Sequence, residues 1–405
     1  MSKHQLNKLL IVTAVVLVAA FWATSTRSPE SNEELAGKPL IDGLQKDINA
    51  VTSLRLVEAG DKAIVTLVKG ESNWTVAERD HFPADVTKVR EYLLKLADAD
   101  LLEAKTSKKE SHAKLGVEDL AEATAKGTRV ELEGLKAPVK VVIGNANSLG
   151  QSGTFVRRND EAQSWLAKGT LIPERLIGNW LAKDILDVQS SRIERFDLTK
   201  GGKTLSGFKL RTQDDKYTIE NVPKGRELTS EYEGNTLAAV LASLTLEDVR
   251  KSAGNTPDPI TTVAARYTTF DGVVVDVTGW MEGDKGYARF AARLDETKAD
   301  AHITNAQDLA KAAYTLAKSE YDTRSAEFAK KKAEDKTLSD ADAPMEPEVP
   351  AAVADAAKDK AEQLAKLKQE VDLINTRCLG WDYQLPAYKF SSMNKTLEEM
   401  LKPAT

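Results

Sequence analysis

Two stretches of the chain, residues 51–102 and 192–249, show the same order of apolar and polar positions. In each stretch, short alternating runs precede a proline and then apolar residues at helical spacing, which predicts three strands and a covering helix. The predicted strands span 54–58, 63–69 and 74–77 in the first stretch and 193–198, 207–211 and 216–220 in the second. The predicted helices follow Pro83 and lie around residues 237–244. We therefore predict a tandem duplication.

The pattern continues in parallel after each helix. The first copy is completed by predicted strands at 128–132, 139–143, 154–158 and 165–167 and a closing helix at 173–181. The second copy is completed by predicted strands at 262–268, 273–280, 286–294 and 381–385 and a helix at 394–401. Asp-Gly and Gly-Asp turns join neighbouring strands of the second copy, as hairpins require. The expected fold class is α+β, with mostly antiparallel sheets and covering helices.

A helical segment interrupts the second copy between residues 305 and 376, where Ala, Lys, Glu and Asp dominate around a proline-rich centre. The spacing of 3, 4 and 3 residues on its second half is typical of a coiled-coil seam. The seam residues are Leu364, Leu367, Val371 and Ile374, and the positions expected to face them on the first half are Leu309, Ala313 and Leu316. We interpret the segment as an inserted helical hairpin and a candidate partner-binding surface, with a self-contained hairpin as the alternative.

The N-terminus carries an uncharged apolar run over residues 9–26, preceded by Lys3 and Lys8. About 18 residues at 1.5 Å rise make roughly 27 Å of helix, close to the thickness of a bilayer core. The residues expected in the membrane are Leu9, Leu10, Ile11, Val12, Val15, Val16, Leu17, Val18, Phe21 and Trp22. The positive flank predicts an uncleaved anchor with a cytoplasmic N-terminus and the bulk of the chain in the periplasm. A signal peptide cleaved after Ala23-Thr-Ser25 is the alternative.

These predictions divide the chain into six parts. They are a cytoplasmic N-terminus (1–8), a transmembrane anchor (9–26), a tether (27–50), a first α+β repeat (51–185), a second repeat (186–304 plus 377–405) and the inserted hairpin (305–376). A length of 405 residues fits two domains with accessory segments.

Charge and cysteine content exclude some classes. Lys and Arg number 56 against 62 Asp and Glu, a net charge of −6, so the chain lacks the basic footprint of a nucleic-acid binder. Cys378 is the single cysteine, which rules out an intramolecular disulfide. Its thiol is expected to be a small buried hydrophobe, with a reactive thiol as the alternative.

No combination of residues matches a known catalytic, cofactor-binding or metal-binding motif. His4, His81, His112 and His302 lie far apart and lack metal-ligand spacing. The Gly144–Gly153 stretch joins two predicted strands and lacks the Gly-Lys-Ser/Thr ending of a phosphate loop. The sequence also has no Gly-x-Ser-x-Gly elbow. We therefore expect a non-enzymatic protein with no cofactor.

Two groups of residues have both a structural interpretation and a functional alternative. Arg157-Arg158 with the acidic residues after them is expected to be a charged hairpin, with an anion site as the alternative. The predicted strands and closing helices carry Trp74, Trp165, Trp180, Trp280 and Trp381. We interpret these tryptophans as core anchors, with an aromatic platform for sugars as the alternative.

Several motifs carry a family resemblance. They are Gly37-Lys-Pro-Leu-Ile-Asp-Gly-Leu44, Trp74-Thr-Val76, Phe82-Pro-Ala-Asp85, Leu115-Gly-Val117, Gly153-Thr-Phe-Val-Arg-Arg158 and Gln163-Ser-Trp-Leu166. Together with the anchor, they resemble the bacterial family known as domain of unknown function 4340. The resemblance covers most of residues 28–295 and the final strand and helix, and the helical hairpin departs from it. It implies a membrane-anchored envelope protein that accompanies an ABC-type transporter, and it implies no catalytic residue.

Two functions follow as expectations. The preferred one is a non-enzymatic periplasmic accessory protein, anchored in the inner membrane, with ABC permease or ATPase subunits as partners. The alternative is an envelope module that binds glycan or peptidoglycan, or a hydrolase acting on them.

Overall fold

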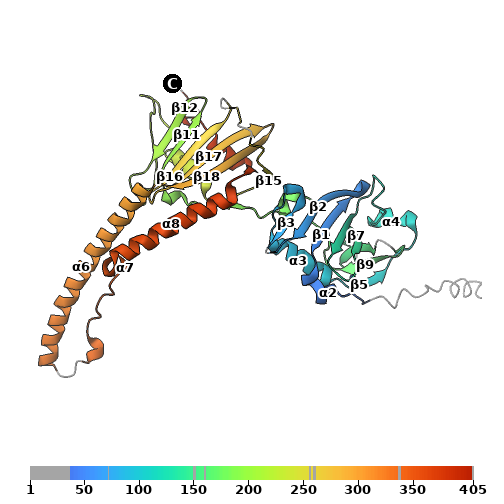
Figure 1. Ribbon diagram of the computed structural model, residues 1–405, viewed down its shortest axis with the longest axis horizontal. Helices are drawn as coiled ribbons and strands as arrows, with labels where there is room; N and C mark the ends of the chain where they lie inside the picture. The colour runs from blue at the N-terminus through green and yellow to red at the C-terminus, as the bar shows by residue number, and fades with distance from the viewer. Residues whose placement is uncertain are drawn as a thin grey trace, which may run out of the picture. The chain divides into compact units, whose positions relative to one another are not determined.

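The computed structural model describes residues 37–71, 73–148, 152–158, 161–254, 257–258, 261–335 and 339–403 (Figure 1). The chain forms two compact units that divide after Leu181. Each unit is α+β, with antiparallel strands. The anchor predicted over residues 9–26 lies outside the described residues, as do residues 27–36 of the predicted tether. The rest of the tether packs on the first unit rather than extending freely, since Leu40, Ile41 and Leu44 are buried. Within the described ranges, none of the helices combines the length and the apolar character needed to cross a membrane.

The first unit contains one nine-stranded sheet in the order β4-β3-β2-β1-β6-β7-β8-β9-β5. Its strands are β1 (Ser53–Glu58), β2 (Lys62–Lys69), β3 (Trp74–Val76), β4 (Phe82–Pro83), β5 (Leu101–Ala104), β6 (Thr128–Glu133), β7 (Val139–Asn147), β8 (Gly153–Arg158) and β9 (Ser164–Lys168). Its helices are α2 (Leu44–Asp47), α3 (Val86–Ala97) and α4 (Lys109–Leu115).

Helix α3 forms as the sequence predicts. The side chain of Asp85 accepts hydrogen bonds from the backbone N–H groups of the first turn, which stabilises the helix start. Val89, Leu93 and Leu96 are buried on one face. The helix thus covers apolar residues while its polar positions face solvent.

The second unit contains an eight-stranded sheet in the order β13-β12-β11-β16-β17-β18-β19-β15 and a small β10-β14 sheet. Its strands are β10 (Asp184–Leu186), β11 (Ile193–Lys200), β12 (Lys203–Phe208), β13 (Thr218–Ile219), β14 (Leu244–Thr245), β15 (Asp248–Lys251), β16 (Val263–Thr269), β17 (Val273–Glu282), β18 (Lys285–Leu294) and β19 (Trp381–Gln384). Its helices are α5 (Glu233–Ala238), α6 (Glu296–Glu334), α7 (Ala351–Ala354), α8 (Ala356–Cys378) and α9 (Ala387–Met393).

The two large sheets share one strand order. Strands β3-β2-β1-β6-β7-β8-β9-β5 of the first follow one another as β13-β12-β11-β16-β17-β18-β19-β15 do in the second. One connection differs greatly in length. From β8 to β9 the chain passes directly from Arg158 to Ser164, whereas from β18 to β19 it leaves at Leu294 and returns at Trp381. The long connection contains α6, α7 and α8.

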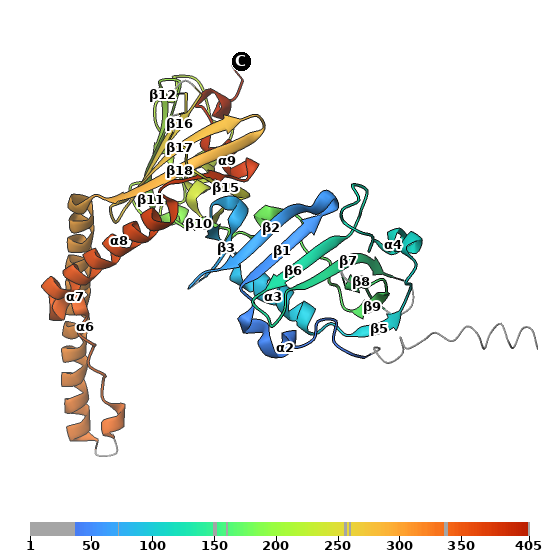
Figure 2. The ribbon, with the colours of Figure 1, turned by 45° about the vertical axis from the view of Figure 1, so that its right-hand side comes forward.

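We call residues 296–378 the arm. Helix α6 has 39 residues, which corresponds to about 58 Å at 1.5 Å per residue. The base of the arm packs on the large sheet of the second unit. Its buried residues there are Ala299, Ile303, Val371, Ile374 and Cys378. Both ribbon views show α6 extending well beyond the start of α8 (Figures 1 and 2).

The helix predicted over residues 173–181 is wrong. Only a 3₁₀ turn forms there, at Ile177–Trp180. The backbone of this segment pairs elsewhere, because Leu181 bridges to Ala84 and the Trp180 carbonyl accepts from the Asp85 N–H at 2.8 Å. These bonds replace the ones that a helix would make.

Both helices predicted late in the second repeat are displaced. The helix expected around 237–244 ends early, because Ser243 has a φ of 44° and Leu244 pairs with β10. The helix expected at 394–401 forms earlier, as α9, and a 3₁₀ turn follows at Glu398–Met400. Leu401 instead bridges to Leu228.

Other boundaries also differ from the prediction. The strand expected at 207–211 is β12, which ends at Phe208. The helical insertion begins at Glu296 rather than at residue 305. Strands β5 and β15 and helix α4 were not predicted.

Candidate functional site

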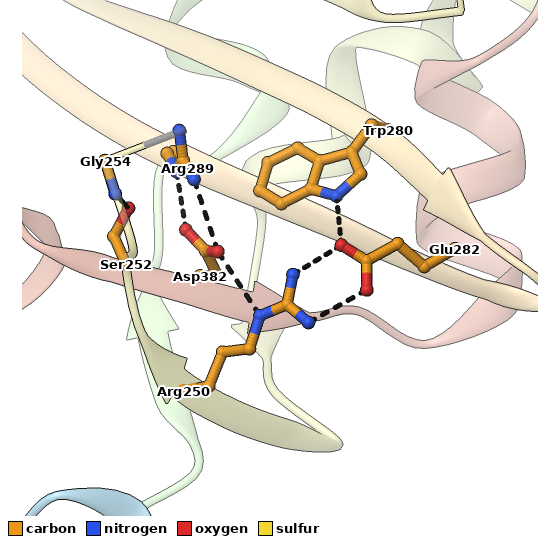
Figure 3. Close-up of polar contacts among 7 residues, drawn as sticks. All are labelled: Arg250, Ser252, Gly254, Trp280, Glu282, Arg289 and Asp382. Carbon is orange, nitrogen blue, oxygen red and sulfur yellow. Dashed lines mark hydrogen bonds and ion pairs between the residues drawn. The ribbon is translucent and has the colours of Figure 1, made fainter. Parts of the chain in front are cut away.

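Four strands at one side of the second sheet bring charged and aromatic side chains together (Figure 3). Arg250 lies on β15, Trp280 and Glu282 on β17, Arg289 on β18 and Asp382 on β19. Trp280 and Glu282 are two residues apart on β17 and so face the same side of the sheet. Arg250 lies directly opposite Asp382 on the neighbouring strand. The cluster therefore forms from positions that are far apart in sequence.

The two arginines are held by carboxylates. The Arg250 guanidinium donates to Glu282 with an Nη1–Oε2 distance of 2.8 Å, and its Nε donates to Asp382 Oδ2 at 3.3 Å. Arg289 donates to both oxygens of Asp382. The Trp280 indole N–H donates to Glu282 Oε1 at 2.8 Å. Figure 3 shows these bonds as one continuous network.

Two aromatic rings pack against the arginines of this network. The Trp280 and Tyr287 rings stack with centroids 6.0 Å apart and planes inclined by 20°. The guanidinium of Arg289 lies 4.9 Å from the Trp280 centroid and that of Arg250 lies 4.4 Å from the Tyr287 centroid. Cation–π contacts of this kind favour arginine over lysine at both positions.

The network borders a cavity of about 610 Å³, which Lys251, Asp258 and Thr261 also line. The hydrogen bonds from Arg250 and Trp280 lower the pKa of Glu282 to about 2, so this carboxylate stays ionised near neutral pH. It therefore does not supply a proton as a general acid. Asp382 is only 2% exposed and is neutralised by two arginines. We interpret the network as structural: it links the edge strand β15 to β17.

Metal chemistry has no evident ligand set in the parts of the chain that the structure describes. Within them, no group of three or more His, Cys, Asp and Glu side chains could hold a metal ion. His112 is buried on α4, and its Nε2 lies 2.9 Å from the Ala162 carbonyl oxygen.

The arm is held at its base by a second network. Arg192 donates through Nη1 and Nη2 to both oxygens of Glu370 on α8, each at 2.7 Å. Its Nε donates to Asp271 at 2.7 Å. The Asn375 side chain donates to the Ala292 carbonyl and accepts from the Ala292 N–H, both at 2.8 Å. Strand β19 pairs with β18 only at Tyr287 and Ala288. The Asn375 amide therefore supplies the hydrogen bonds of Ala292, farther along the edge of β18, where β19 no longer pairs.

A cavity of about 540 Å³ lies in the first unit, between the segment that precedes α2 and strand β7. Leu40, Ile41 and Val141 contribute apolar walls, and Arg158 lies among the lining residues. Arg158 donates to the backbone carbonyls of Pro39 and Leu40, each at 3.1 Å, and to Glu161 at 3.2 Å. These bonds attach the first described residues to β8.

Arg157 has a similar structural role on the opposite face of β8. Its Nε donates to the Val117 carbonyl at 2.8 Å, and its Nη1 donates to the Glu161 carbonyl at 3.2 Å. Arg157 is 8% exposed, and burial lowers its pKa. The Arg157-Arg158 pair therefore binds backbone carbonyls, which is closer to the predicted charged hairpin than to an anion site.

The tryptophans are mostly in the core. Trp74, Trp165, Trp180 and Trp280 are buried, with Trp165 at 0% and Trp280 at 6% exposure. Trp381 is half-buried. A sugar needs an accessible ring face to stack on, and neither Trp165 nor Trp280 offers one.

Cys378 is buried at the end of α8. Burial raises the pKa of its thiol to about 12, with a smaller opposing effect of Arg377. The thiol stays protonated at neutral pH, and a protonated thiol is a poor nucleophile. The structure thus favours the hydrophobic interpretation.

The predicted hairpin residues divide into two groups. Val371 and Ile374 are buried and Leu364 and Leu367 are half-buried. Leu309 and Leu316 are each 64% exposed on α6, so the prediction that they face the other helix is wrong. The end of helix α8 packs on β18, and its first half lies along the start of α6. The contacts between the two helices run from the Lys368–Glu296 ion pair, at 2.9 Å, out to Gln307, which donates to the Ala356 carbonyl at 2.8 Å.

The relationship to known proteins rests on one region. Residues 74–262 match the model of a family described as Domain of unknown function (DUF4340). No curated protein and no solved structure matches the chain.

The DUF4340 match begins at β3 of the first unit and ends just before β16 of the second. It therefore includes Arg157, Arg158 and Arg250 but neither the arm nor the partners of Arg250 on β17 and β19. The motifs at Trp74 and Phe82 lie inside the matched range, and Gly37–Leu44 lies outside it. Sequence reasoning missed the Arg250 network because its members are spread over about 130 residues and come together only through the pairing of four strands.

Proposed function

We propose that this chain is a non-enzymatic accessory protein of the bacterial envelope that binds partner proteins through its arm. The partner we propose is an ABC-type transporter, through its permease or ATPase subunits. We further propose that residues 9–26 anchor the chain in the inner membrane, with the two units in the periplasm. The resemblance described above supports this setting, and the arm supports the binding role.

The observation that carries the proposal is the length of one connection. The first unit completes its strand order with a direct passage from β8 to β9. The second unit has the same order yet devotes residues 295–380 to the equivalent passage. The sheet does not need this insertion in order to close. A long insertion that adds little to the core is more readily explained by binding than by stability.

The surface of the arm agrees with this role. Leu309 and Leu316 expose apolar side chains seven residues apart, which places them on one face of α6. Ala306 and Ala313 are also exposed and lie on the same face. Apolar side chains aligned on a helix and left uncovered are typical of a docking face for another protein.

We also infer that the two units arose from a tandem duplication. The shared order of eight strands supports this origin, as do the paired Trp-Thr-Val and Tyr-Thr-Ile strands β3 and β13. On this view the arm is a later insertion into the second copy.

Co-purification from native membranes tests the proposal. The full chain, tagged at its C-terminus, is solubilised in mild detergent and compared with a variant whose residues 308–355 are replaced by a four-residue Gly-Ser loop. Gln307 contacts Ala356, so a short loop can join α6 to α8 at this level while the buried base stays intact.

We expect transporter subunits with the full chain and at least a tenfold lower recovery with the shortened arm. Equal recovery from both would remove the arm from the interaction. The absence of transporter subunits from both would remove the proposed partner.

The glycan-binding alternative has less support. It needs exposed tryptophan faces, and the structure buries Trp165 and Trp280. Substituting either tryptophan with alanine is expected to destabilise the fold, which is the result for a core residue rather than for a sugar platform.

A further inference from the structure

A proline segment lies alongside the outer part of α6. We call residues 343–350 the strap, which contains Pro344, Pro347 and Pro350. The three prolines are half-buried, whereas the residues between them, from Met345 to Val349, are exposed. A polyproline-II helix has three residues per turn, so residues three apart share one edge. The burial pattern therefore turns the proline edge toward the protein.

The backbone at the end of the strap agrees with this conformation. Pro350 has φ −61° and ψ 149°, close to the ideal polyproline-II values. The strap runs directly into α7 at Ala351. Both ribbon views draw it next to α6 (Figures 1 and 2).

One ion pair fixes which part of α6 the strap faces. Lys318 Nζ lies 2.7 Å from Glu346 Oε1 and 4.7 Å from the centroid of the Tyr321 ring. Tyr314, Ala317 and Tyr321 are half-buried on the same side of α6. Outward from Gln307, where α8 begins, α7 packs on α6 and the strap follows it. The Lys318–Glu346 ion pair places the strap beside α6 at the level of Lys318. We call Tyr314, Ala317, Lys318 and Tyr321 the aromatic stripe.

The repeats of the two elements match. Tyr314 and Tyr321 are seven residues apart, about 10.5 Å along an α-helix. Prolines three residues apart advance about 9.3 Å along a polyproline-II helix. Successive prolines can therefore meet Tyr314 and Tyr321, which lie about two helical turns apart. Aromatic surfaces that bind proline-rich peptides use the same principle, because the ligand is already extended and loses little entropy on binding.

We propose that the aromatic stripe is a docking surface for polyproline-II segments, and that the strap is its resident ligand. A proline-rich segment of a partner, with prolines at every third residue and an acidic residue between them, takes the place of the strap when the arm engages. The strap then acts as an intramolecular competitor. The biological use of this surface rests on the partner-binding role proposed above, whereas the docking chemistry does not.

The strength with which the strap competes with a free peptide can be estimated. A segment tethered next to its site has an effective concentration in the millimolar range. A free peptide of the same sequence therefore competes poorly with the strap of the intact chain. Loosening the strap removes the competitor and leaves the stripe accessible.

The test uses the full chain and a fluorescent peptide with the sequence of residues 342–352. Binding is measured by anisotropy to the wild type and to a strap-opened variant, Pro344→Ser/Pro347→Ser/Pro350→Ser. We expect at least tenfold tighter binding to the opened variant, and a further Lys318→Glu substitution to weaken it at least threefold. Equal affinity for wild type and opened variant, or equal binding of a peptide with serines in place of its prolines, overturns the proposal.

A second variant covers the case in which the opened arm loses helix, as judged by circular dichroism. Glu346→Lys sets a like charge opposite Lys318 and leaves the prolines and α6 intact. Glu348→Lys makes the same change at another exposed strap position and serves as the matched control. We expect tighter peptide binding with Glu346→Lys than with the control, and equal binding by the two overturns the proposal.

The two proposals fail separately. Peptide binding without recovery of a transporter counts against the proposed function alone. Recovery of a transporter without peptide binding counts against the docking surface alone.

Discussion

Replacing Asn375 with alanine removes two hydrogen bonds that attach α8 to the edge of β18. The Asn375 amide bonds both the N–H and the C=O of Ala292 at 2.8 Å. Ala292 is 9% exposed, so water replaces these bonds poorly. Each neutral hydrogen bond is worth about 1 kcal/mol, and each buried group left without a partner costs about 1–3 kcal/mol. We therefore expect local opening of this edge to become easier by about 3 kcal/mol.

Hydrogen exchange measures that opening directly. A change of about 3 kcal/mol corresponds to roughly hundredfold faster exchange of the Ala292 amide, since 1.4 kcal/mol is a factor of ten. Mass spectrometry of a peptic peptide that contains Ala292 reports the rate. Asn305→Ala is the matched control, because Asn305 lies on the exposed face of α6 and undergoes the same gain in helix propensity.

The control is expected to leave the exchange of Ala292 unchanged. Exchange within twofold of wild type in Asn375→Ala would refute the reasoning. It would mean that α8 does not protect the β18 edge in solution.

Four further predictions follow from burial and charge. Trp165→Ala is expected to destabilise the first unit by about 3–5 kcal/mol in urea unfolding, because the indole is fully buried, and a loss below 1 kcal/mol would contradict its core position. A double-mutant cycle between Arg192→Ala and Glu370→Ala is expected to give a coupling of about 1 kcal/mol, since both side chains are more than a quarter exposed, and zero coupling would show that the Arg192–Glu370 ion pair does not stabilise the protein. Cys378 should resist a thiol reagent at pH 8 in the native chain and react on unfolding, as a thiol with a pKa raised to about 12 must, and rapid native labelling would contradict its burial. The pKa of Glu282 falls from its ordinary value of 4.5 to about 2 on folding, so its contribution to stability is complete above pH 4.5 and is lost as the pH falls toward 2. Glu282→Gln should therefore make the free energy of unfolding fall less steeply with decreasing pH in this range. An unchanged pH dependence would show that another group dominates.

Much of the fold was predictable because alternation is a local signal. Strands such as β16 and β18 alternate buried and less buried positions over six or more residues, and the sequence predicted both. Strand β5, by contrast, has four residues and directly follows α3, so alternation gives little warning of it. The false helix at 173–181 arose because its backbone pairs with Ala84 and Asp85, a contact about 95 residues distant that no local pattern encodes.

The candidate sites were less predictable than the fold. The Arg250 network depends on the register of β15 against β19, and the intervening sequence includes the whole arm. The coiled-coil prediction failed for Leu309 and Leu316 because the apolar seam of α8 packs on β18, and because the strap lies beside the outer part of α6. The proline spacing was visible in the sequence, but the surface that it faces was not.

Photo-crosslinking in living cells tests the central claim most directly. A photoreactive amino acid replaces Leu316 on α6 in one strain and Leu94 on α3 in another, since both leucines are at least half exposed and belong to different units. We predict a crosslink from position 316 to an ABC permease subunit, whose periplasmic face the arm can reach, and none from position 94. A crosslinked transporter subunit from position 94 alone, or none from position 316, would contradict the role of the arm.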